Sequence, residues 1–235
     1  MGLSGQGWIE VLRRLALQVA LVLAATAGFG ASDWGMALLW AGVGIATYVV
    51  LPRPKPPEGA MIVARMPSVY MPDLVAALLA TTFLAMPFII AAREAWLGGP
   101  WGLMLFMWLP GLVALLIYWI AAKSHCHWLL LDDRTLHLTT IHGRDEIALA
   151  DIALVRPEVR YPPRWLGPLL VLFGGIRGAG IALLHANRPS HALIVERRGG
   201  ASIRLPADAF PDGRKLLRRL DRAGVPLSAD LRATA

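Results

Sequence analysis

Four long apolar runs in the first half of the chain constrain its fold more than any other feature. They occupy residues 15–29, 34–51, 74–92 and 101–122, and 56% of the 235 residues are hydrophobic. A helix needs about 20 apolar residues to cross a bilayer core of about 30 Å. The runs therefore predict an integral membrane protein with four transmembrane helices, at about residues 12–30, 34–51, 73–92 and 101–122.

The distribution of basic residues predicts which side of the membrane each end of the chain faces. The connection 30–33 has no Lys or Arg, and the single arginine of connection 93–100 is offset by a glutamate. Other basic residues flank the runs: Arg13 and Arg14 before the first, where they can snorkel to the headgroups, and Arg53, Lys55 and Arg65 in the loop 52–72. Because cytoplasmic loops are enriched in Lys and Arg, we expect a multi-pass protein of the inner membrane with both termini in the cytoplasm.

The first run also resembles a cleavable signal peptide, with two preceding arginines, an apolar core and the small residues of GFGAS. Only residues 30–33 separate it from the second run. That short spacing favours a helical hairpin over a cleaved leader.

Ionisable residues are expected at the ends of the predicted spans and not inside them. Asp73 stands at the start of the third run, where it is expected to cap the helix. Ion-coupled transporters need ionisable groups within the bilayer, so this class of protein is not expected.

The second half of the chain has the pattern of short antiparallel strands. HWLLLDD, RTLHLTTIHG, DEIALADI, ALVRPEVRY, GIALLHA, HALIVERR and ASIRLP are rich in Leu, Ile, Val and Thr and are separated by turn residues. The Gly199-Gly200 pair predicts a hairpin turn. A helix is predicted at 211–223, with a leucine stripe on one side and basic residues on the other.

The segment DDRTLHLTTIHGRDEIALADIALV, together with the terminal helix from Arg214 to Ala223, resembles the bacterial pleckstrin-homology-like (PH-like) domains of small membrane proteins. This resemblance implies a small, partly open β-barrel closed by a helix, which binds lipids or proteins and has no fixed binding motif. The expected fold class is thus α+β: a four-helix transmembrane domain, 1–122, and a cytoplasmic β-barrel-like domain, 123–235.

The stretch RWLGPLLVLFGGIRGAGIALLHANR, residues 164–188, is expected to lean on the inner leaflet. Its apolar part, 165–176, is too short to span, and the residues after it are more basic than a non-cytoplasmic tail should be. Trp165 and Phe173 would anchor it, with Arg164, Arg177 and Arg188 near lipid phosphates. A fifth span through residues 165–186 is the alternative.

The basic residues predict anionic partners. With a net charge of +7 in a membrane protein, lipid headgroups are favoured over nucleic acid, which is not expected as a partner. Arg214, Arg218 and Arg222 share one side of the terminal helix and would face the membrane surface. The leading hypothesis is a non-catalytic scaffold, assembly or regulatory protein that binds anionic lipid headgroups or a membrane protein partner.

Histidines near the end of the fourth run give the main alternative. In an extended segment His125 and His127 would face the same way, and His137 or His142 on the next strand could add a third metal ligand. A membrane-associated metal-dependent enzyme or factor, or a transporter subunit, is therefore the runner-up. No catalytic motif accompanies these residues, so neither an enzyme nor a cofactor is expected.

Overall fold

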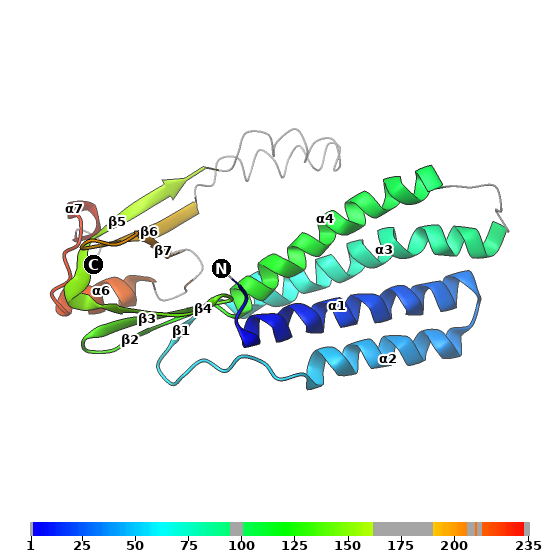
Figure 1. Cartoon of the computed structure of the whole chain (residues 1–235), viewed down its shortest axis with the longest axis horizontal. Helices are drawn as coiled ribbons and strands as arrows, with labels where there is room; N and C mark the ends of the chain where they lie inside the picture. The colour runs from blue at the N-terminus through cyan, green and yellow to red at the C-terminus, as the bar shows by residue number, and fades with distance from the viewer. Residues whose placement is uncertain (1, 95–100, 162–189, 206–209, 211–212, 233–235) are drawn as a thin grey trace. The chain divides into compact units, whose positions relative to one another are not determined.

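The computed structural model describes residues 2–94, 101–161, 190–205, 210 and 213–232 (Figure 1). Its contacts divide the chain into two compact units. Unit 1 comprises Met1–Leu129 and Leu138–Asp145, and unit 2 comprises Leu130–His137 and Glu146–Ala235. The fold is α+β, as the sequence predicts, with apolar helices in unit 1 and antiparallel sheets.

Helices α1 (Gly5–Ala25), α2 (Trp34–Val50), α3 (Met71–Glu94) and α4 (Trp101–His125) lie alongside one another in unit 1 (Figure 1). Two π-helical turns extend them, Thr26–Gly30 after α1 and Met66–Tyr70 before α3. Helix α1 begins earlier than the predicted span because Ser4 caps it, its hydroxyl oxygen accepting from the Gly7 N–H at 3.1 Å. Helix α4 ends at His125, three residues beyond the predicted end.

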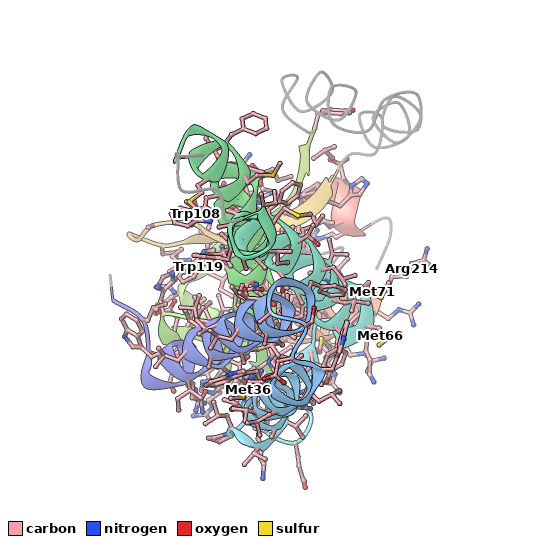
Figure 2. The ribbon with its side chains drawn as sticks, turned by 90° about the vertical axis from the view of Figure 1, so that its right-hand side faces the viewer. Met36, Met66, Met71, Trp108, Trp119 and Arg214 are labelled. Atoms are coloured by element: carbon pink, nitrogen blue, oxygen red, sulfur yellow. The ribbon has the colours of Figure 1, made fainter. Side chains whose placement is uncertain are left out.

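The outer surface of the helices is apolar, as lipid contact requires. Leu38 is 74% exposed and Phe106 is 72% exposed, and Figure 2 labels Met36, Met66 and Met71 on the outside of the bundle. Among the residues that the structure describes, three helical segments are long and apolar enough to cross a membrane: Gly5–Gly30, Met66–Ala92 and Phe106–His125. Helix α2 is a shorter apolar helix, and its 17 residues span about 25 Å.

Small residues allow the helices to pack closely. A Cβ atom on Gly44 of α2 would lie 2.8 Å from the Ala20 Cβ of α1. Ala76, Ala80 and Ala121 are fully buried. Close backbone approach at small side chains is the usual basis of helix association in a bilayer, where lipid removes the hydrophobic driving force.

In the part of the chain that the structure describes, the strands form two antiparallel sheets and not a closed barrel, and the PH-like arrangement stays a prediction. One sheet has the order β1-β2-β3-β4 and the other β5-β6-β7. Their bounds are Met61–Ile62, Trp128–Leu131, Thr135–Thr140 and Gly143–Ala148 for the first, and Ile152–Arg160, Ser190–Arg197 and Ile203–Leu205 for the second. Strand β1, which the sequence did not predict, pairs Met61 with Leu129.

Residues 226–228 pack against β5 of the second sheet. Helix α6 (Gly213–Arg222) buries Leu216, Leu217 and Leu220, and a short helix, α7 (Ala229–Arg232), follows it. Between the helices the chain lies beside β5, where the Val155 N–H donates to the Pro226 carbonyl at 2.9 Å. The leucine stripe of the predicted terminal helix therefore belongs to the core of unit 2.

Candidate functional site

A network of charged side chains lies inside the helix bundle of unit 1, on one face of α1. Glu10, Arg13 and Arg14 are spaced three and four residues apart, which places them on the same side of a helix. All three are buried, at 0%, 1% and 0% exposure. Because the bundle surface around them is apolar, these charges are stable only if they neutralise one another and share hydrogen bonds.

Glu10 is the centre of this network. Its Oε2 atom accepts from Arg13 Nη2 at 2.6 Å and from Arg14 Nη1 at 2.6 Å. His125 Nδ1, at the end of α4, lies 2.7 Å from the same oxygen. The same Nδ1 atom also lies 3.2 Å from Arg13 Nη2, so the imidazole contacts both the carboxylate and a guanidinium. One carboxylate oxygen thus joins α1 to α4.

Arg14 extends the network to α3 and α2. Its Nε donates to Asp73 Oδ1 at 2.7 Å and its Nη2 donates to Asp73 Oδ2 at 2.9 Å, a bidentate pair. The Tyr48 hydroxyl of α2 also donates to Asp73. Side chains from all four helices therefore meet at one end of the bundle, near the start of α3 and the end of α4.

A second set of polar side chains lies further along the helices, and it is uncharged. Gln18 Nε2 donates to Thr81 Oγ1 at 3.0 Å, and the Tyr118 hydroxyl donates to Gln18 Oε1 at 3.2 Å. Among the described residues, the buried charged side chains are those of the network at the bundle end. The polar interior thus changes from charged to neutral along α1.

The network lies at one end of the bundle, where ionisable residues were expected, but its side chains are buried and paired. Arg13 and Arg14 do not extend outward from the bundle, because both are buried and pair with carboxylates. Asp73 does not cap a helix that starts beside it, because the helical chain already begins at Met66. The spacing of Glu10, Arg13 and Arg14 was the signal in the sequence that could have revealed the network, since opposite charges at this spacing on an apolar helix favour pairing.

The structure places the four histidines of the metal hypothesis in different surroundings. His125 belongs to the buried network. His137, in unit 2, contacts Asp132 at 2.8 Å and Glu146 at 3.3 Å. His142 lies against the Trp119 ring, with centroids 6.5 Å apart. Within the described ranges, no group of three or more His, Cys, Asp or Glu side chains is arranged to hold a metal ion.

Cys126 and His127 follow the end of α4 and are poor candidates for chemistry. Burial, with the nearby Glu10 charge, raises the pKa of the Cys126 thiol to about 12, so the thiol stays protonated and unreactive at neutral pH. Burial, with the charge of Lys123, lowers the pKa of His127 to about 4. His127 is therefore neutral at physiological pH.

Helix α6 displays the basic face that the sequence predicts. Five cationic side chains and one acidic side chain are exposed along it: Arg214, Lys215, Arg218, Arg219, Arg222 and Asp221. Figure 2 shows the Arg214 side chain extending away from the ribbon. The predicted lipid contacts of Arg164, Arg177 and Arg188, the anchors Trp165 and Phe173, and the alternative fifth span lie outside the described residues.

No protein-family model matches the chain, and comparisons with curated proteins and with solved structures find no match. Inferences about function therefore rest on the chain's own residues.

Proposed function

We propose that the chain is a non-catalytic protein of the inner membrane that holds a cytoplasmic, PH-like β domain against anionic lipid headgroups, in a scaffold, assembly or regulatory role. All four helices span the bilayer, and both termini face the cytoplasm. The exposed basic face of α6 is the observation that supports lipid binding. The bundle end that carries Arg13, Arg14, Arg53 and Lys55 supports the orientation, since basic residues favour the cytoplasmic side.

The packing of α6 determines how it would bind a membrane. Its leucines are already buried, at 2% for Leu216 and 0% for Leu220, so they are not free to insert between lipids. Contact with the bilayer is then electrostatic, through the opposite face. Each Lys or Arg near an anionic surface contributes about 1 kcal/mol. Such binding weakens as salt screens the charges.

We expect a variant with Arg214→Glu, Arg218→Glu and Arg222→Glu to lose its hold on anionic membranes. Three charge reversals remove about 3 kcal/mol of attraction and add repulsion, which corresponds to a loss of about a hundred-fold or more in affinity. The full chain, held in phosphatidylcholine nanodiscs on a surface, would be exposed to vesicles with and without phosphatidylglycerol. The wild-type chain should retain the phosphatidylglycerol vesicles, and less so at high salt.

A matched control places the same charge change elsewhere in unit 2. Arg134, Arg198 and Arg232 are exposed outside α6, and their replacement by glutamate gives the same net charge. If this control lost as much binding as the α6 variant, net charge would be responsible and not the helix face. If neither variant lost binding, the lipid proposal would fail, and a membrane protein partner would be the candidate for this surface.

The absence of catalysis stays a prediction, as do the metal-dependent factor and the transporter subunit as alternatives. The raised pKa of the Cys126 thiol supports the non-catalytic proposal, because a protonated thiol is a weak nucleophile. The separate surroundings of His125, His137 and His142 give no support to a shared metal.

A further inference from the structure

Arg13 makes poor use of its hydrogen-bonding capacity although it is 1% exposed. Its Nη2 donates to Glu10 and lies 3.2 Å from His125 Nδ1, and its guanidinium carbon lies 4.9 Å from the centre of the Tyr48 ring. Its Nε and Nη1 atoms are buried and have no hydrogen-bond partner among the described residues. By contrast, all three nitrogens of the neighbouring Arg14 donate, to Asp73 and Glu10. The two arginines therefore have different roles.

Burying donors without acceptors is costly. Each unsatisfied buried group costs about 1–3 kcal/mol, and charged groups cost more. A guanidinium cannot relieve this cost by losing its proton. The unpaired Nε and Nη1 donors of Arg13 therefore call for an acceptor that the described side chains do not supply.

The charges around Arg13 indicate that this acceptor is an anion. Arg53, which is exposed on the loop after α2, lies close enough to Arg13 for the two charges to repel. Arg13, Arg14 and Arg53 carry three formal positive charges, and Glu10 and Asp73, which bind the first two, carry two negative charges. These five side chains therefore carry one excess positive charge. A ligand with a single negative charge would neutralise this excess charge. Lying between Arg13 and Arg53, it would also relieve the repulsion between them.

A phosphate diester fits these requirements. Its oxygens match the fork of N–H groups on a guanidinium, and it carries one negative charge. Tyr48 lies in the last turn of α2 and His125 is the last residue of α4, so Arg13 lies near the depth of the lipid headgroups. Glu10 Oε1 is also buried without a partner among the residues that the structure describes, which favours a headgroup that offers hydroxyl donors.

We propose that Arg13 and Arg53 bind the phosphate of a phospholipid with a hydroxyl-bearing headgroup, at the end of the helix bundle. Arg13 would hold the phosphate within the bundle, and Arg53 would approach it from the exposed side. This site belongs to unit 1 and uses none of the residues of α6. It therefore stands or fails independently of the lipid contact proposed for the basic helix.

The test uses the full chain purified in a neutral detergent. Phosphatidylglycerol or inorganic phosphate would be added, with the melting temperature and, by native mass spectrometry, the bound lipids as readouts. We expect phosphatidylglycerol to raise the melting temperature and to remain bound. Arg53→Gln should weaken this binding several-fold, and Arg13→Gln should abolish it. Lys55→Gln, which makes the same charge change on the same exposed loop, should leave it unchanged.

Arg53 is exposed, so the Arg53→Gln and Lys55→Gln pair decides the test even if Arg13→Gln fails to fold. Equal binding of phosphatidylglycerol by both variants and the wild type would overturn the site, as would a lack of stabilisation by either ligand. If inorganic phosphate stabilises the chain as well as the lipid does, and Arg53→Gln weakens that effect, the phosphate chemistry holds and the free ion is the ligand.

Discussion

Replacing Glu10 by glutamine should lower the free energy of unfolding by about 3–5 kcal/mol, the cost of removing one partner from a buried ion pair. The Oε2 atom of Glu10 accepts from two arginines and contacts His125. A neutral amide leaves Arg13 without its charged partner. The NH₂ group of the amide would also face the N–H donors of the arginines. We expect α1 to lose its attachment to α4 first, because Arg14 keeps its bidentate pair with Asp73.

Unfolding of the full chain in mixed detergent micelles, by titration with a denaturing detergent, measures this loss. Glu58→Gln is the control, since Glu58 is exposed and makes the same change of charge. A Glu10→Gln variant as stable as Glu58→Gln would show that the network contributes nothing to holding the helices together.

Replacing Gly44 by leucine should separate α1 from α2 and lower the free energy of unfolding by about 1–3 kcal/mol or more. A Cβ atom on Gly44 would lie 2.8 Å from Ala20 Cβ and 3.3 Å from Leu17 Cδ1. The Ala20 side chain is a single methyl group and has no other rotamer. The helices can accommodate the larger residue only if they move apart.

Gly42 provides the matched control on the same helix. A Cβ atom there would meet nothing within 4 Å, so Gly42→Leu adds the same side chain on an open face. The same detergent titration should find Gly42→Leu close to the wild type. Equal destabilisation by both substitutions would mean that the close contact at Gly44 is not what fixes α2 against α1.

The hydrophobic periodicity of the sequence predicted the helices and strands that local composition determines. The apolar runs became helices α1 to α4, and the strands from Trp128 to Arg160 appear in the predicted order. The Gly199 turn has a φ of 82°, which a glycine adopts easily. These elements depend on local composition, which a single sequence displays.

Pairings between distant segments could not be predicted in this way. Arg14 and Asp73 are 59 residues apart, and Glu10 and His125 are 115 residues apart. An arginine before an apolar run is stable either in the headgroup layer or buried beside an acidic partner. The neighbouring sequence does not distinguish these two positions. Strand β1 could not be predicted for the same reason, because its two residues become a strand only by pairing with β2.

The sidedness of α6 tests the proposed function most directly, because its basic face can hold the inner leaflet only from the cytoplasm. In a chain with Cys126→Ser, single substitutions Ala31→Cys, between α1 and α2, and Lys215→Cys, on α6, place one thiol at an exposed position. A membrane-impermeant maleimide should label the Ala31→Cys chain in spheroplasts and the Lys215→Cys chain only in inverted membrane vesicles. Labelling of the Lys215→Cys chain in intact spheroplasts would place α6 outside and contradict the proposal.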